Sequence, residues 1–363
     1  MIRKITNMIL IFIVVVSCNE NKPKTIEFRI DDNKFKVSEF NISDIHTTKH
    51  ILKIQKIYGI FTDIAVKDSL LVCGNLYDPK LLNLYSLNNE KLLNQIIKRG
   101  TSTKEGLSAS NFYLQNNIGN SSLWIYDITL GKLFKTELSK VIKDSSLVPQ
   151  KEISLKSSLK NLIAPQIITD NLILATSYSL DDCRYFYTDG SKILKKVGLL
   201  PNVTNNIKLK NISKTKIPNK AYIFKAFSIK NPNSNQIAVF YNKTDRAEFY
   251  DNDQLYKVWN STNNFNPVMQ VAKLNDGYVV QDSDKTKYAY LSITSDEKYI
   301  YALYAGNEEN KTSSDIILVF DWSGNSVKKI SLDRKVCKIA LEPHKRIVYC
   351  YDDVTKNIFS TQL

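Results

Sequence analysis

The chain has 363 residues, of which 43% are hydrophobic and 24% are charged, and its formal net charge is +14 at pH 7. This composition is typical of a folded globular protein and excludes an intrinsically disordered chain. The lysines and arginines are scattered singly, without the basic block that tracks phosphates, so the positive charge does not indicate nucleic-acid binding.

The N-terminus has the pattern of a secretory signal. Arg3 and Lys4 precede the apolar run Met8–Val16, and Ser17-Cys18 closes it. The run is too short for the roughly 20 apolar residues of a membrane-spanning helix, and it has the length of the apolar core of a signal peptide. A small residue followed by cysteine resembles the lipobox of bacterial lipoproteins.

That resemblance implies that the Cys18 sulfur receives a diacylglycerol, that the chain is cut before Cys18, and that the new amino group is acylated, with palmitate as an expected chain. We therefore expect residues 1–17 to be a cleaved signal peptide and Cys18 to be the lipid attachment site. Two or more acyl chains hold a protein stably on a membrane. Asn19 favours the outer membrane as the destination.

Two other interpretations of the N-terminus remain, namely an uncleaved anchor helix and a plain secretory signal with a chance cysteine. The polar run over residues 18–24 argues against the anchor helix. Residues 18–40 are expected to form a polar tether with strand-like stretches at 26–30 and 34–37. Residues 41–363 are expected to form one domain of short strands rich in Ile, Val, Tyr and Phe, broken by Asn, Asp, Gly, Ser and Pro.

A hairpin pattern recurs along this domain, with a hydrophobic strand, an aromatic or acidic residue, a turn and a second strand. It lies at residues 82–93, 123–134, 184–194, 247–256 and 317–328. A second strand pair accompanies most copies, at residues 63–73, 165–175, 299–304 and 338–349. Two hairpins form a four-stranded antiparallel unit that cannot cover its own apolar faces, and radial stacking of several units covers them.

The sequence therefore predicts an all-β fold, a six-bladed β-propeller of four-stranded antiparallel blades. Five full repeats and a C-terminal part-repeat indicate six blades. The strand missing from the last blade is expected from the N-terminal side, near 26–40 or 51–57, and would close the ring. Two β-sandwiches in tandem are the alternative, but no Pro/Gly-rich linker divides the chain.

Several segments carry a resemblance to a known family. They are Ser69–Val72, Lys98–Gly100 with Glu105 and Asn111-Phe112, Ser295–Tyr304, and Val319–Asn325. The chain resembles the TolB-like six-bladed β-propeller lipoproteins of Bacteroidota, a likeness that spans most of residues 50–363. It departs at residues 100–105, where relatives carry a glycine- and proline-bearing loop, so no role of that loop is carried over. The resemblance implies a fold and a location and no particular chemistry.

The four cysteines besides Cys18 form no CxxC motif, which argues against a metal cage or a redox pair. Cys337 and Cys350 flank a predicted hairpin. With its turn at Pro343-His344 the two would face one another, and an oxidising envelope would permit a disulfide. Two buried thiols are the alternative.

No catalytic or metal-ligating residue is predicted. His46 and His50 have a spacing that suits zinc on a helix, but the glutamate of an HExxH motif is missing and the context reads as strand or loop. His344 is expected in a surface turn. Closely spaced acidic residues are interpreted as turn formers. They occur at Asp181-Asp182, Asp251 and Asp253, Asp282 and Asp284, and Asp352-Asp353.

The favoured function is a lipid-anchored binding or scaffold module without a cofactor, whose loops and central funnel bind an envelope protein, a peptide or a glycan. Tyr222, Phe224 and Phe227 belong to a less regular stretch that could reach an end face and stack on sugars. The alternative is a propeller hydrolase or lyase that acts on glycans with carboxylates gathered in the funnel. An enzyme would need two ionisable groups that converge on one reacting atom.

Overall fold

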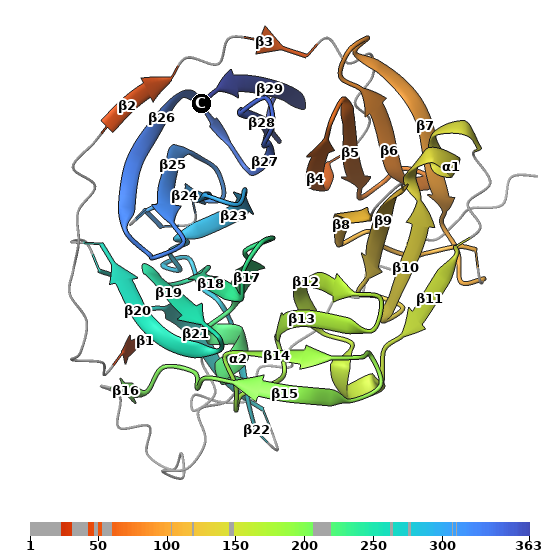
Figure 1. Ribbon diagram of the computed structural model, residues 1–363. Helices are drawn as coiled ribbons and strands as arrows, with labels where there is room; N and C mark the ends of the chain where they lie inside the picture. The colour runs from red at the N-terminus through yellow and green to blue at the C-terminus, as the bar shows by residue number, and fades with distance from the viewer. Residues whose placement is uncertain are drawn as a thin grey trace, which may run out of the picture.

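A computed structural model describes residues 23–30, 43–46, 50–52, 60–102, 104–117, 120–144, 149–205, 219–261, 264–274, 277–306, 308–309 and 311–363. Six antiparallel sheets stand around a central opening, so the predicted all-β, six-bladed propeller is confirmed (Figure 1). The signal peptide and Cys18 lie outside the described residues. Among the described residues, no helix has the length and apolar character needed to cross a membrane.

The first three blades follow one another along the chain, each from its innermost strand outward. Blade 1 contains β4 (Phe61–Lys67), β5 (Leu70–Asn75), β6 (Lys80–Ser86) and β7 (Lys91–Lys98). Blade 2 contains β8 (Asn111–Asn117), β9 (Asn120–Asp127), β10 (Lys132–Glu137) and β11 (Lys151–Ser154). Blade 3 contains β12 (Leu162–Thr169), β13 (Leu172–Ser177), β14 (Tyr185–Thr188) and β15 (Ile193–Val197).

Of the last three blades, blade 4 uses four consecutive strands, whereas blades 5 and 6 each add a strand from the N-terminal side. Blade 4 contains β17 (Ala226–Lys230), β18 (Gln236–Tyr241), β19 (Arg246–Asp251) and β20 (Gln254–Asn260). Blade 5 contains β23 (Tyr290–Ser295), β24 (Tyr299–Tyr304), β25 (Ser314–Asp321) and β26 (Ser326–Val336), with β2 (Ser43–His46) added in parallel outside β26. Blade 6 contains β27 (Lys338–Glu342), β28 (Ile347–Asp352), β29 (Asn357–Gln362) and β3 (His50–Ile51).

The ring closes in blade 6, where the outermost strand β3 comes from the N-terminal side and pairs with β29 near the C-terminus. Leu52 extends this contact, since its backbone N–H donates to the Ile358 carbonyl at 3.0 Å. The ring-closing pairing therefore lies at residues 50–52, beside the second of the two predicted segments. The first predicted segment, near 26–40, overlaps β1 (Lys24–Ile30), which pairs in a separate sheet and does not close the ring.

An accessory sheet outside the six blades was not predicted. It contains β16 (Val203–Asn205), β1, β21 (Val268–Leu274) and β22 (Gly277–Asp282), and Figure 1 places it beside blades 3 and 4. The helical elements are short: α1 (Leu138–Lys143), a 3-10 turn at Ser157–Leu159 and α2 (Lys220–Ile223). The hairpin predicted at 123–134 forms the second and third strands of its blade, because β8 alone precedes it there, whereas the copies at 82–93 and 317–328 form the third and fourth strands.

Six clusters of buried side chains form the core, and each lies between two neighbouring blades. The second strand of a blade is covered on both faces, and all six residues of β5 are buried. In outermost strands such as β7, the first three residues are exposed to solvent. The hydrophobic effect therefore acts between blades, as the repeat predicted.

Blade 5 holds the residues that carry the C-terminal family signature. Asp296 caps the β23–β24 turn, and the Trp322 indole N–H donates to the Asp296 carbonyl at 3.0 Å. Gly324 has φ +72°, and a Cβ there would lie 2.6 Å from the Phe249 ring of blade 4. Only glycine both adopts this backbone conformation without strain and leaves room for the neighbouring blade.

Candidate functional site

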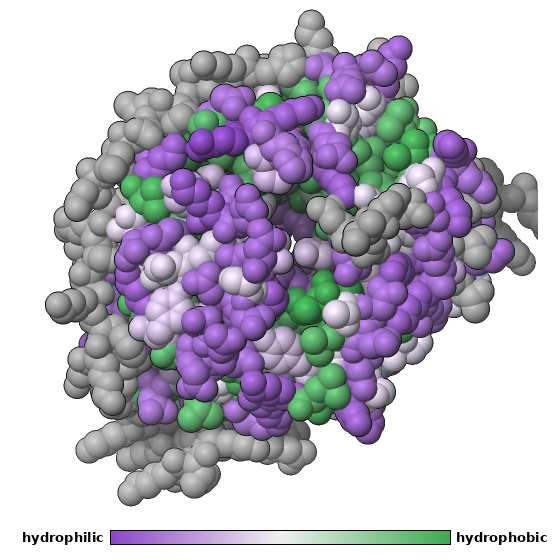
Figure 2. Space-filling model, in the orientation of Figure 1, coloured by the Kyte–Doolittle hydropathy of each residue, from purple (hydrophilic) through white to green (hydrophobic). Residues whose placement is uncertain are grey.

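A cavity of about 720 Å³ occupies one end of the central channel. The innermost strands of all six blades line it, namely β4, β8, β12, β17, β23 and β27. Figure 2 shows a hollow at the centre of the visible face, surrounded mainly by hydrophilic residues. The volume lies within the range of about 300–1,000 Å³ that ligand pockets occupy.

The innermost strands present their open edges to this channel. Side chains of β4 alternate between the two neighbouring blades, with Ile64 and Val66 in the cluster toward blade 6 and Ala65 packed toward blade 2. Among the described strands, none pairs with the edge that faces the channel. Each such edge offers backbone N–H and C=O groups to a ligand.

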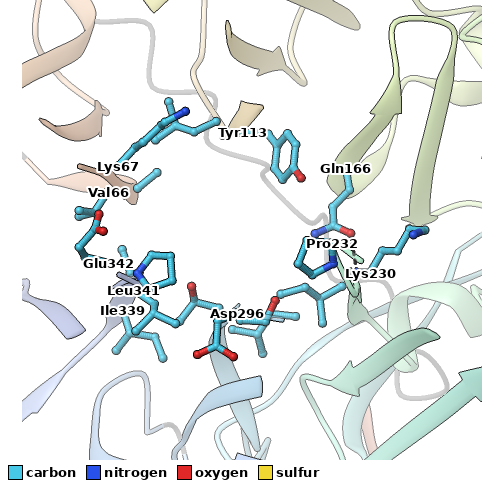
Figure 3. A pocket seen from close by; sticks show the side chains of 18 of the residues that line it. Val66, Lys67, Tyr113, Gln166, Lys230, Pro232, Asp296, Ile339, Leu341 and Glu342 are labelled. Carbon is cyan, nitrogen blue, oxygen red and sulfur yellow. Dashed lines mark hydrogen bonds between the residues drawn. The ribbon is translucent and has the colours of Figure 1, made fainter. Parts of the chain in front are cut away.

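Side chains of mixed character surround this cavity. In Figure 3, Tyr113 and Gln166 lie on one side of it, facing Val66 and Glu342 on the opposite side. Tyr113 comes from β8 and Gln166 from β12, and the Gln166 Oε1 accepts the backbone N–H of Lys230 at 2.7 Å. Blades 2, 3 and 4 thus contribute to the same wall.

Two of the carboxylates at this cavity are already bonded within the protein. Asp63 accepts the backbone N–H of Ile64 at 3.0 Å and the Asn111 amide at 3.3 Å. Burial raises the pKa of Asp63, although Lys338 acts to lower it. Asp296 accepts the backbone N–H groups of Lys298 and Tyr299 at 2.7 and 2.6 Å, so it serves as a turn former.

Glu342, at the end of β27, differs from these carboxylates. Its residue is 1% exposed, and its Oε2 has no hydrogen-bond partner in the part of the chain that the structure describes. A buried carboxylate oxygen without a partner is costly. Hydrogen bonds within the protein therefore account for the positions of Asp63 and Asp296 but leave one oxygen of Glu342 without a partner.

Two lysines at the cavity, Lys230 and Lys67, also form contacts within the protein. The Lys230 ammonium donates to the carbonyls of Asn231, at 3.1 Å, and Ser234. Burial lowers the pKa of Lys230. Lys67 contacts the Ser121 hydroxyl. These contacts hold both side chains in place at the wall.

The predicted pair Cys337 and Cys350 is not bonded in the structure. Both sulfurs are free, and Cys350 lies opposite Ile339 in the β27–β28 pairing instead of opposite Cys337. The turn occupies residues 343–346, which shifts the register away from a facing pair. The two thiols pack in different clusters. The disulfide stays a prediction that this register does not favour.

The histidines are distributed over three places. His46 lies in β2 and His50 in β3, and their side chains are outside what the structure describes. His344 is exposed in the β27–β28 turn at the rim of the cavity. Among the described residues, no three His, Cys, Asp or Glu side chains gather as metal ligands would.

Of the paired acidic residues, Asp352 acts locally, as expected. Asp352 accepts the backbone N–H of Val354 at 2.8 Å. Asp181 does not act in a local turn, because it accepts the backbone N–H of Ala221, 40 residues along the chain, at 2.6 Å. Asp253 instead joins strands, since it accepts the hydroxyls of Tyr185 and Tyr187 at 2.7 and 2.9 Å. Asp282 pairs with a lysine, which turn chemistry did not predict.

Tyr113, Gln166 and Glu342 were not predicted from the sequence as functional residues. A signal exists in hindsight, because each is a polar or amphipathic residue in the first strand of a repeat, next to the channel. Without the order of strands in each blade, such residues cannot be told from those on the solvent face.

The comparisons with known proteins agree with this architecture. A family model described as TolB-like 6-blade propeller-like matches residues 34–343. The chain belongs to this family. No curated protein sequence matches it.

Solved structures resemble this TolB-like propeller in fold alone. A member of the DUF4221 family from Bacteroides vulgatus is 10% identical with a TM-score of 0.51, and the alignment covers 94% of this chain and 97% of that one. Raptor from Chaetomium thermophilum is 8% identical with a TM-score of 0.51, and the alignment covers 87% of this chain. The TolB-like propeller spans only 29% of the Raptor chain.

Proposed function

We propose that this TolB-like propeller is a non-enzymatic binding module, tethered to the cell envelope by a lipid on Cys18 and facing the periplasm or the cell surface of an outer membrane. Its central channel would take an extended segment of a peptide or a glycan. The observation that carries this proposal is the cavity of about 720 Å³ bounded by the open edges of six inner strands.

The chemistry of the lining supports binding over catalysis. An extended chain can use the backbone groups of the strand edges for hydrogen bonds and the Tyr113 ring for stacking. Asp63 and Asp296 are held by hydrogen bonds within the protein. General acid–base catalysis requires such groups to reach a reacting atom.

A screen of the purified protein against envelope peptides and envelope polysaccharides tests this function by calorimetry. Tyr113→Ala should weaken the binding of a ligand found in this screen by about fivefold or more, because a stacked ring contributes on the order of 1 kcal/mol. The matched control is Tyr77→Ala, since Tyr77 is 71% exposed and outside the cavity. Equal losses in both variants would contradict a role of the channel.

A second candidate function is hydrolysis or lysis of glycans, and Glu342 is the observation that favours it. A buried carboxylate at a cavity, with one oxygen that no described group hydrogen-bonds, is a candidate general acid or base. The same screen decides between the two, by measuring product formation beside binding. Turnover by the wild type that Glu342→Gln abolishes would establish the enzyme, whereas binding without turnover favours the module for those ligands.

A further inference from the structure

A second cavity, of about 380 Å³, lies at the opposite end of the same inner strands. The central cavity uses residues near the ends of β17 and β23, such as Lys230 and Ser295. The second cavity uses residues at their beginnings, including Lys225 and Leu291. Three tyrosines, two lysines and one aspartate are among its lining residues: Tyr178, Tyr222, Tyr288, Lys225, Lys243 and Asp282.

The β18–β19 turn supplies the floor of this cavity. Residues 242–245 are all buried, which is unusual for a hairpin turn. The chain between blades 4 and 5 covers them. The Thr244 hydroxyl donates to the Phe265 carbonyl at 2.7 Å, and the Asn242 amide donates to the Tyr290 carbonyl at 2.8 Å. The accessory hairpin β21–β22, which belongs to the same covering segment, ends at Asp282 in the cavity wall.

Lys243 and Asp282 form the fixed ion pair of this cavity. The Lys243 side chain is 2% exposed, and its ammonium lies 3.6 Å from the centre of the Tyr222 ring. Asp282 also accepts the hydroxyls of Tyr288 at 2.7 Å and Tyr222 at 3.2 Å. Burial acts to raise the pKa of Asp282, but the hydrogen bonds from Lys243 and the tyrosines hold it below its usual value.

Lys225 is the second cation and has no carboxylate of its own. Within the described residues, its ammonium makes no hydrogen bond or ion pair, and it lies 5.6 Å from the ring centres of both Tyr178 and Phe227. Burial, followed by repulsion from Lys338, lowers the pKa of Lys225 to about 8, although attraction to Asp282 acts to raise it. The Lys225 side chain is half-buried, and the nearby carboxylate of Asp282 already pairs with Lys243, so two lysines share one carboxylate and one positive charge is left in excess.

The charge and the shape of this cavity specify a ligand. With Asp282 paired to Lys243, the Lys225 charge calls for one anionic group. The Tyr178 and Tyr222 rings, 6.2 Å apart and tilted by 36°, form an aromatic wall that suits the apolar face of a sugar ring. We propose that this cavity binds a single uronic-acid residue, with its carboxylate on Lys225 and its ring against Tyr178 and Tyr222.

Titration with sodium glucuronate, followed by NMR on the full mature chain, tests the proposal. Glucose carries the ring without the charge, and acetate carries the charge without the ring. We expect glucuronate to bind at least about tenfold more tightly than either compound. If glucuronate binds no better than glucose or no better than acetate, the proposed ligand class is wrong.

The decisive variant is Lys225→Met, which removes the charge and keeps an unbranched apolar side chain. It should lower glucuronate affinity at least about tenfold and leave the thermal unfolding midpoint unchanged or higher, since it removes a half-buried ammonium that has no ion pair of its own. Lys98→Met, at an exposed position of β7, is the matched control and should bind as the wild type does. Wild-type affinity in Lys225→Met would overturn the proposal.

A pH series provides a measurement that needs no variant. The charged groups near the ligand carboxylate are Lys225, Lys243, Lys338 and Asp282. Burial lowers the pKa of Lys243 to about 8 as well, outweighing its pairing with Asp282. Glucuronate binding should therefore weaken between pH 7 and pH 10, and constant affinity over that range would contradict the assignment.

This site is independent of the proposed function of the central cavity. Tyr113→Ala, which should impair binding in the central cavity, should leave glucuronate affinity unchanged. Loss of glucuronate binding in Tyr113→Ala would place the sugar in the central cavity and overturn the second site.

Discussion

At the scale of single residues, the most informative feature is a carboxyl group that the fold buries. Asp245 is fully buried in the β18–β19 turn, where the Ser261 hydroxyl contacts it and its Oδ1 has no hydrogen-bond partner among the described residues. Burial raises the pKa of Asp245 to about 6, although hydrogen bonds from Ser261 and Tyr304 act to lower it. The folded state therefore favours the protonated carboxyl.

This burial predicts a pH dependence of stability. A raised pKa in the folded state gives stability that is present below the unfolded value of 3.8 and is lost as the pH rises through about 6. Over that window the loss is roughly 3 kcal/mol, at 1.36 kcal/mol per pKa unit. Asp245→Asn should remove most of this slope, as measured by urea unfolding between pH 4 and pH 8.

The matched control is Asp284→Asn, at an exposed position, and it should keep the wild-type slope. An Asp245→Asn variant with the wild-type slope would show that another group is responsible.

Another residue-scale feature, an ion cluster inside blades 3 and 4, was invisible in the sequence. Glu248 is fully buried and pairs with Arg184 and with Arg246, whose Nε lies 2.7 Å from its Oε1. The Tyr250 hydroxyl donates to Glu248 at 2.9 Å. Arg184 and Glu248 are 64 residues apart, so no local pattern could place them together.

At the scale of secondary-structure elements, ring closure depends on a very short strand. β3 adds only two residues to β29, but Leu52 next to it is 6% exposed and packs in the cluster between blades 6 and 1. In the same cluster, the Phe61 ring of blade 1 lies 4.7 Å from the Tyr351 ring of blade 6. The packing at this junction therefore compensates for the few hydrogen bonds of the closing strand.

Leu52→Ala should destabilise the fold by about 2–5 kcal/mol, the cost of a cavity at a buried leucine. Leu255→Ala is the matched control, because Leu255 lies on the outermost strand of blade 4 and is 43% exposed, and it should change stability by about 0.5 kcal/mol or less. Denaturant unfolding measures both. Equal effects would mean that the N-terminal segment does not secure the ring.

At the scale of the whole molecule, the proposed lipid site, Cys18, lies only a few residues before β1, the first described strand. A lipid on Cys18 would hold the propeller close to the membrane, since β1 is bound to the accessory sheet beside blades 3 and 4. The accessory sheet would then determine which side of the propeller lies nearest the lipid surface.

Cys18→Ser should abolish incorporation of an alkynyl palmitate analogue and leave residues 1–17 attached, because the cut depends on the modified cysteine in the lipoproteins that this N-terminus resembles. Gel fluorescence and intact mass of the purified chain measure the two effects. Cys337→Ser is the control and should be labelled and cut normally. Labelling of Cys18→Ser would exclude Cys18 as the attachment site.

The sequence alone determined the all-β class, the six blades and the use of both chain ends for closure, because short strands with apolar faces repeat along the chain and no single sheet can bury them. Residues 123–134 show the limit of that pattern, since this hairpin supplies the second and third strands of its blade where the copies at 82–93 and 317–328 supply the third and fourth.

Only the tertiary structure decided which side chains line the central channel and which side chains meet in the cavity at each of its ends. Glu342, Tyr113 and Gln166 come together across three blades, and Asp282 reaches Lys243 because an accessory hairpin folds over blade 4. Local sequence patterns report periodic burial within one strand. The contacts that form both cavities join residues far apart in the chain, and only the closed ring together with its accessory hairpin brings them together.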